Sequence, residues 1–212
     1  MRKQFDEQLN KLQSLMKESA NYCEEALDKA TRVFFEKDLK LSEQVFSITR
    51  AIDKKTRKIE NLCFTLLLRQ QPVAIDLRRI TASLKTNFDM KRISSQAFDI
   101  TEISKVSLIP TGKEISEDET AIIKKMAEQT KTIFSKSVST FFAMDAKSAE
   151  ALIQDDDIVD ECFAQIKSRI AADLTNKEAG DYAVDVLLIA KYFERISDHS
   201  INIARWTVKY FG

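Results

Sequence analysis

The sequence predicts an all-α protein built as a tandem repeat of two antiparallel three-helix bundles. Only 3 glycines and 2 prolines occur in 212 residues, which leaves few places for the frequent turns that strands require. Apolar residues recur at spacings of three and four over long stretches, as expected for amphipathic helices. The Arg-Ile-Ser segment at 92–94 returns at 195–197, so the structural unit is duplicated. Six long helices of about 30 residues, each near 45 Å, predict an elongated molecule.

Three helices are expected in the first half, residues 1–108. The first extends to about Glu36 and carries an apolar row. The second begins after Asp38, whose side chain can cap it, and ends before Pro72, because the residue preceding a proline disfavours helical geometry. The third begins at Asp76, where an acidic residue suits the positive end of a helix. The apolar row of the first helix comprises Phe5, Leu9, Leu12, Met16, Cys23, Leu27, Ala30 and Phe34.

Residues 109–115 are the predicted linker, since Pro110 and Gly112 combine a helix breaker with a turn former. The second half, residues 116–212, starts with Ser116 and Glu119 at the spacing of a capping box. Its three helices are expected to be separated by breaks near residues 145 and 175, and the last is expected to span roughly Lys177 to Tyr210.

Composition excludes several classes of protein. The 33 basic and 33 acidic residues cancel, so a nucleic-acid binder with its basic excess is not expected. No apolar run reaches the roughly 18 residues that span a bilayer, and the N-terminus lacks the apolar core of a signal peptide. With three glycines there is no Gly-rich phosphate loop. The odd set of Cys23, Cys63 and Cys162 indicates buried free thiols in a reducing cytoplasm.

Two acidic pairs in the second half form a candidate metal site. Glu194 and Asp198 are four residues apart on the last helix, and Asp156 and Asp160 repeat that spacing on the helix before it. Carboxylates at i and i+4 project from one helix face, and facing helices can use them to hold a divalent or trivalent ion such as Fe, Zn, Mn or Mg. The alternative is a solvated acidic patch whose carboxylates pair with Arg or Lys.

The first half lacks most of these carboxylates. The matching positions are Thr49, Asp53, Lys91 and Ser95. Lys91 could supply internally the positive charge that a cation supplies in the second half, or it could be an ordinary surface lysine. The single histidine, His199, is either a peripheral ligand or an interhelical residue with a satisfied hydrogen bond.

Two motifs give the chain a family resemblance. The Gln-Pro-x-Ala-x-Asp-Leu-Arg element at 71–78 and the Glu-Arg-Ile-x-Asp element at 194–198 resemble those of the PhoU family, phosphate-uptake regulators, and the likeness covers essentially the whole chain. The resemblance implies a cytoplasmic, non-enzymatic adaptor that acts with phosphate-specific ABC transporter subunits and a sensor histidine kinase, at the inner face of the membrane through these partners. It also implies metal binding at Glu/Asp-x-x-x-Asp motifs, which match only Asp156/Asp160 and Glu194/Asp198 here.

Two further hypotheses accompany this interpretation. The rival function is a metal-dependent enzyme on a helical scaffold that acts on phosphate compounds. A homodimer is also expected, because apolar residues surround much of the last helix and need more than one face to bury them. Those residues are Ala183, Val186, Leu187, Ile189, Phe193 and Ile196.

Overall fold

The computed structural model describes residues 2–69, 72–112, 114–154, 157–173 and 180–212. The described chain is helical throughout, apart from short connections, and contains no strand. The first half holds α1 (Arg2–Glu36), α2 (Lys40–Arg69) and α3 (Ala74–Ile103), which a π-helical turn η1 (Ser104–Leu108) and α4 (Ile109–Thr111) continue. The second half holds α5 (Glu117–Ala143), α6 (Ala146–Gln154), α7 (Asp157–Asp173) and α8 (Gly180–Phe211).

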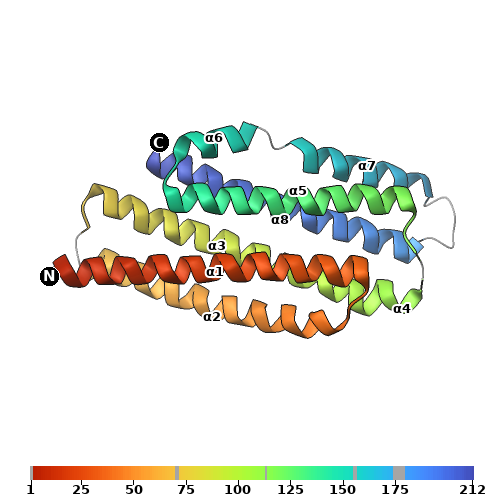
Figure 1. The fold of residues 1–212 in the computed structure, drawn as a ribbon, viewed down its shortest axis with the longest axis horizontal. Coiled ribbons are helices and arrows are strands. Elements are labelled where there is room, and N and C mark those ends of the chain that lie inside the picture. The colour runs from red at the N-terminus through yellow and green to blue at the C-terminus, as the bar shows by residue number, and fades with distance from the viewer. Residues whose placement is uncertain (1, 70–71, 113, 155–156, 174–179) are drawn as a thin grey trace.

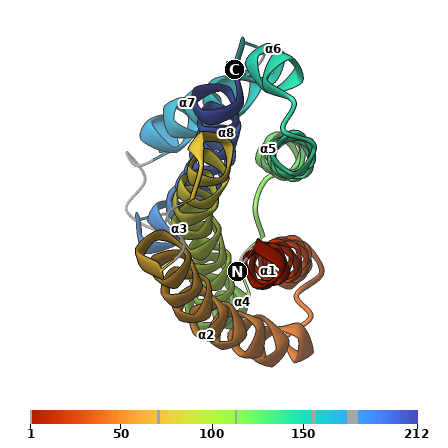
Figure 2. The same cartoon turned by 90° about the vertical axis from the view of Figure 1, so that its left-hand side faces the viewer.

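The two halves pack side by side along their whole length. Figure 1 shows an elongated molecule with both termini at the same end, the α1–α3 group below and the α5–α8 group above. In the end view, α3 and α8 form the central pair, with α1 and α5 together on one side of them (Figure 2). The α3–α8 contact is the most extensive between any two helices, and α1 also touches α5. The third helix of each repeat therefore joins the halves.

Local signals place most helix ends where the sequence predicts them. The Ser116 hydroxyl accepts a hydrogen bond from the Glu119 N–H at 3.3 Å, and the Glu119 carboxylate accepts one from the Ser116 N–H at 3.3 Å, which confirms the capping box. Asp38 also acts at a helix start, because its Oδ1 accepts the Lys40 N–H at 3.1 Å. These bonds satisfy backbone donors that a helix start leaves unpaired.

The third helix extends further than the sequence suggests. The Ile109 N–H donates to the Ser104 carbonyl, so the helix widens by one residue into a π turn and continues to Thr111. Pro110 follows in α4 and has no N–H to donate. Gly112 then ends the helix with φ of +64°, a left-handed conformation that glycine adopts without strain. The predicted linker 109–115 thus begins as helix, and the domain bounds themselves stay a prediction.

Two described helices cover the range of the fifth predicted helix, between 145 and 175. They are α6 and α7, and residues 155–156 between them lie outside the described part of the chain. Asp157 and Asp160 occupy the first turn of α7.

A buried carboxylate joins α3 to α8 at the centre of the molecule. Asp89 on α3 is only 8% exposed. Its Oδ1 lies 2.8 Å from Nδ1 of His199, and its Oδ2 accepts the indole N–H of Trp206 at 2.7 Å. Both partners are on α8, so one side chain fixes the register of the two helices. His199 is therefore an interhelical residue, one of the two roles expected from the sequence.

Other sequence expectations concern burial. All three cysteines are free and buried, as predicted, and burial raises the pKa of the Cys23 thiol and raises that of Cys63 to about 12. The apolar residues of α8 that suggested a dimer face the chain's own core: Ala183, Val186, Ile189, Phe193 and Ile196 are buried and Leu187 packs against them. No described helix combines the length and apolar character needed to cross a membrane.

We predict that Asp89→Ala destabilises the protein by about 2–4 kcal/mol, because a buried N–H and the imidazole lose their shared acceptor. Urea unfolding measures the loss. Trp206 is the only tryptophan, so its fluorescence should also shift as the indole loses its bond.

The matched control is Asp53→Ala, which removes a solvent-exposed carboxylate paired with Lys91 and should cost less than about 1 kcal/mol. Equal effects of the two substitutions would contradict a central role for Asp89.

Candidate functional site

Three of the four predicted metal ligands belong to α7 and α8, two helices in contact. Asp160 projects from the first turn of α7, and Glu194 and Asp198 project from α8. The two helices pack against each other, and the charge of Glu194 acts on Asp160 as the charge of Asp160 acts on Asp198. Asp156 lies outside the described residues. We call Asp160, Glu194 and Asp198 the carboxylate cluster.

The carboxylate cluster is electrostatically unfavourable when it is fully ionised. Partial burial, and then the negative charges of Glu194 and Asp157, raise the pKa of Asp160 above its ordinary value. Burial, and then the charge of Asp160, likewise raise the pKa of Asp198. A proton on either carboxylate, or a cation beside it, therefore lowers the electrostatic free energy of the cluster.

Lys191 is the cation closest to the cluster in this structure. Its ammonium forms an ion pair with Oε2 of Glu194 and lies 4.8 Å from the centre of the Phe163 ring. The Glu194 side chain is only 15% exposed, and its Oε2 is buried without a well-directed hydrogen bond. Oε2 therefore keeps an acceptor site that a better-placed cation could use.

The first half has a different arrangement at the corresponding place. Lys91 Nζ lies 3.7 Å from Oδ1 of Asp53, and both side chains are about half exposed. Lys91 stands where the second repeat has Glu194, and Asp53 where it has Asp160. The first repeat therefore holds an ion pair where the second brings two like charges together. The structure thus shows the internal positive charge that the sequence suggested for Lys91.

The residue types of the carboxylate cluster are those that bind a hard cation. Oxygen ligands, raised carboxyl pKa values and a buried acceptor without a directed bond all favour a bound positive charge. Within the described ranges no three His, Cys, Asp or Glu side chains are already gathered closely enough to hold a metal ion. Because Asp156 is not among them, the predicted four-residue set stays a prediction.

The sequence analysis did not identify Asp89 as an important residue. The sequence did contain a signal for a buried carboxylate. One face of α3 carries, at spacings of four, four and three, the residues Asp89, Ile93, Ala97 and Ile100. A carboxylate on a row that is otherwise apolar is expected to be buried and paired. Its partner could not be read from the sequence, since His199 and Trp206 are more than a hundred positions away.

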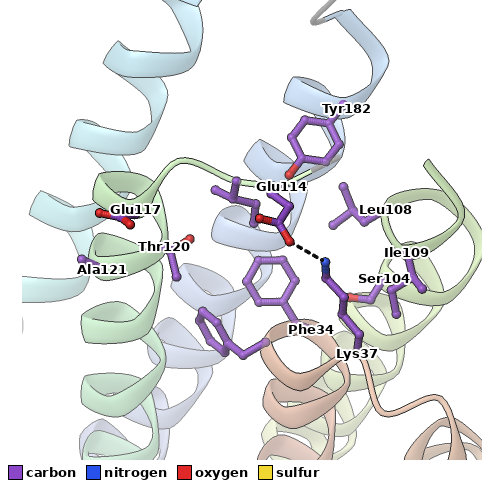
Figure 3. A pocket seen from close by; sticks show the side chains of 12 residues that line it. Phe34, Lys37, Ser104, Leu108, Ile109, Glu114, Glu117, Thr120, Ala121 and Tyr182 are labelled. Carbon is purple, nitrogen blue, oxygen red and sulfur yellow. Dashed lines mark hydrogen bonds and ion pairs between the residues drawn. The ribbon is translucent and has the colours of Figure 1, made fainter. Parts of the chain in front are cut away.

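An apolar pocket lies at the end of the molecule where the halves are linked. Its volume is about 430 Å³, and Phe34, Leu108 and Tyr182 contribute to its walls. Figure 3 shows the Lys37–Glu114 ion pair, with a separation of 3.5 Å, at the edge of this pocket. Burial, and then the charges of Glu119 and Glu114, raise the pKa of Tyr182 to about 12. The lining suits packing between the repeats, not ion binding.

The fold and the cluster define an all-α protein with a duplicated three-helix unit whose second copy carries an acidic site. Comparison with known protein families identifies the family to which this chain belongs. The PhoU domain model matches residues 16–104 and 123–207, which covers both repeats and most of the chain. The protein belongs to the PhoU family.

Individual relatives agree with this assignment. The chain is 30% identical over 205 residues to the phosphate-specific transport system accessory protein PhoU homolog 1 of Methanothermobacter thermautotrophicus, covering 96% of this chain and 92% of the relative. It is 26% identical to PhoU homolog 2 of Mycobacterium tuberculosis, covering 97% and 95%.

Two solved structures share the fold. The crystal structure of PhoU from Pseudomonas aeruginosa has a TM-score of 0.91 at 23% identity and covers 97% of this chain and 98% of that one. The phosphate transport system regulatory protein PhoU from Streptococcus pneumoniae has a TM-score of 0.85 at 20% identity, with 97% and 96% covered.

We predict that Asp160→Asn stabilises the metal-free protein at pH 7, by up to about 0.5 kcal/mol after allowance for solvent screening of this exposed side chain. The folded-state pKa is raised, so the ionised carboxylate opposes folding above that pKa. The gain in stability should shrink as the pH falls through the folded-state pKa, and it should vanish below the ordinary aspartate pKa of 3.8. Unfolding in chelator at a series of pH values measures it. A gain that is independent of pH would exclude this electrostatic cause.

Proposed function

We propose that this protein is a regulator of phosphate transport and of phosphate-starvation signalling that works by binding partners, not by catalysis. The observation that carries the proposal is the match of the PhoU domain to both halves of the chain. Two relatives that align over nearly all of the chain are named as accessory proteins of a phosphate-specific transport system. The partners would be subunits of a phosphate-specific ABC transporter and a sensor histidine kinase, and the protein would act in the cytoplasm at the inner face of the membrane.

We also propose that the second repeat holds a metal ion, bound by Asp160, Glu194 and Asp198 together with Asp156. The mutual repulsion of the described carboxylates supports this, because a divalent or trivalent cation would relieve it. The bound ion, which could be Fe, Zn, Mn or Mg, would supply positive charge and fix the relative positions of α7 and α8. Lys191, now paired with Glu194, would move aside.

The apolar tip between α2 and α3 is our candidate for the transporter contact. The side chains of Leu68, Val73 and Ile75 are 82%, 64% and 54% exposed, which is unusual for large apolar residues so close together. Leu77, 45% exposed, extends the apolar tip into the first turn of α3. A peripheral protein that recognises a transporter needs such a surface, since apolar residues dominate the centre of an interface.

Homodimerisation is retained as a proposal, although the apolar side of α8 that suggested it packs within the chain; light scattering tests it directly. No feature of the described residues favours the alternative of a metal-dependent enzyme acting on phosphate compounds, so we do not adopt it.

We predict that Glu194→Gln combined with Asp198→Asn abolishes metal binding, because both changes remove an anionic ligand and keep its shape. Elemental analysis of the purified protein gives the metal content. Lys91→Ala is the control, since it disturbs the equivalent place in the first repeat and should leave the metal content unchanged. Equal metal in the double variant and the wild type would refute the site, as would two equivalent sites.

We predict that cells lacking this protein express phosphate-starvation genes when phosphate is plentiful. The variant with Asp156, Asp160, Glu194 and Asp198 all neutralised should fold, because removing like charges costs no core packing, yet it should restore repression poorly. A starvation-gene reporter in complemented deletion strains measures both effects. Normal control in the deletion strain would remove the regulatory proposal, and full complementation would make the carboxylate cluster dispensable.

The apolar tip is tested in the same reporter strain. Leu68→Glu should impair repression while the purified variant keeps its stability. Leu39→Glu is the matched control, because Leu39 is also an exposed leucine but lies at the α1–α2 turn, at the opposite end of the bundle (Figure 1). Equal loss in both variants would argue against a contact at the tip.

A further inference from the structure

A basic hollow lies on the surface where α3 meets α8, beside the carboxylate cluster. Its volume is about 640 Å³. The side chains that form it come from both helices and include three arginines. We call it the arginine groove, and define it by Arg92 and Gln96 from α3 and by Arg195, Asp198, His199, Asn202 and Arg205 from α8.

The duplication builds this groove from equivalent positions of the two repeats. Arg92 and Arg195 occupy the same place in the repeated Arg-Ile-Ser segment, and Gln96 and His199 follow each of them by four residues. On a helix, positions four apart share one face. Since α3 and α8 pack together at the centre, the two repeats deliver one arginine each, with a polar side chain next to it, to the same hollow.

The charges of the groove are poorly compensated. Arg92 and Arg195 are exposed and make no ion pair among the described residues. Arg205 donates a hydrogen bond to Oδ1 of Asn202 at 3.0 Å. Asp198 is the carboxylate in the lining, and Asp99 lies near enough to Arg195 for the two charges to interact, so three guanidinium groups face two negative charges. A concave surface with this excess attracts anions.

Two neutral amides add hydrogen-bonding capacity. Gln96 is only 8% exposed, yet its Oε1 has no hydrogen-bond partner within the described structure. An unpartnered carbonyl oxygen accepts hydrogen bonds and does not bind an anion, so Gln96 can contribute only its NH₂ group. Asn202 uses its oxygen for Arg205, which leaves its NH₂ group free to donate. The groove thus offers amide donors beside its guanidinium groups.

We propose that the arginine groove binds a small tetrahedral oxyanion of the phosphate type. Arginine forks pair with phosphate oxygens through two parallel N–H···O bonds, which a point charge cannot do. The two repeat-related arginines would bind the anion from opposite helices, and Gln96 and Asn202 would donate to its remaining oxygens. The inference goes beyond the proposed regulatory function and does not depend on it, because it concerns binding by the purified chain alone.

The test is calorimetric titration of the full chain with inorganic phosphate, in chelator so that no metal bridges the anion, and in about 150 mM salt to screen non-specific attraction. We expect saturable binding. Arg92→Gln combined with Arg195→Gln should weaken it about 10- to 100-fold, the range for losing charge-assisted bonds. Both side chains are exposed, so the variant should fold, and thermal melting verifies this.

Two controls separate a built site from general charge. Arg50→Gln combined with Arg57→Gln removes two exposed α2 arginines outside the groove, so it changes the net charge equally and should leave binding intact. Gln96→Leu changes no charge and should still weaken binding several-fold. Titration with pyrophosphate and with adenosine monophosphate shows whether the preferred source is free phosphate or a phosphorylated molecule; either one, if sensitive to the groove variants, supports the proposal.

Three results would overturn the proposal. The first is no heat and no saturation with any of the three anions at about 10 mM, a concentration far above that of a useful site. The second is an equal loss of affinity in the α2 control. The third is full affinity in the variant that lacks both groove arginines.

Discussion

The α3–α8 contact is the constraint on which the rest of the structure depends. Each of these helices is the third of its repeat, and together they form the central pair on which α1, α2, α5, α6 and α7 are arranged. Asp89 fixes their register, because one buried carboxylate accepts from both His199 and Trp206. A buried carboxylate is tolerated only while it keeps its partners. A shift of α3 along α8 would break these bonds at a high cost in free energy, and this fixes the alignment of the two repeats.

Given that alignment, duplication produces two corresponding places with different chemistry. In the first repeat an attractive pair, Lys91 and Asp53, needs no further ligand. In the second, Asp160 meets Glu194 and the pKa of Asp160 is raised. The two places therefore differ in the charge of a few side chains. Divergence after duplication can thus confine an ion site to one repeat without altering the fold.

Helix α8 serves several purposes because its successive faces meet different neighbours. The charge of Glu194 acts on Asp160 of α7, His199 and Trp206 bind α3, and Arg195 and Asn202 line the groove between α3 and α8. Residues one apart on a helix differ in direction by about 100°, so the single segment 194–206 carries an acidic face, an anchoring face and a basic face. Asp198 belongs to both the carboxylate cluster and the arginine groove, which places the two proposed ligand sites next to each other.

The sequence by itself determined the helices, most of their ends and the duplication, because these depend on interactions over a few residues. The spacing of apolar side chains, Pro72, and the Ser116–Glu119 capping box act locally and could be recognised locally. It also indicated Asp160, Glu194 and Asp198, which lie on two helices that pack against each other. Only the tertiary structure decided that Asp89 binds His199 and Trp206, that Lys91 pairs with Asp53, and that Arg92 meets Arg195 across one groove. These contacts join positions far apart in sequence, and their partners follow from how whole helices pack, which no local pattern encodes.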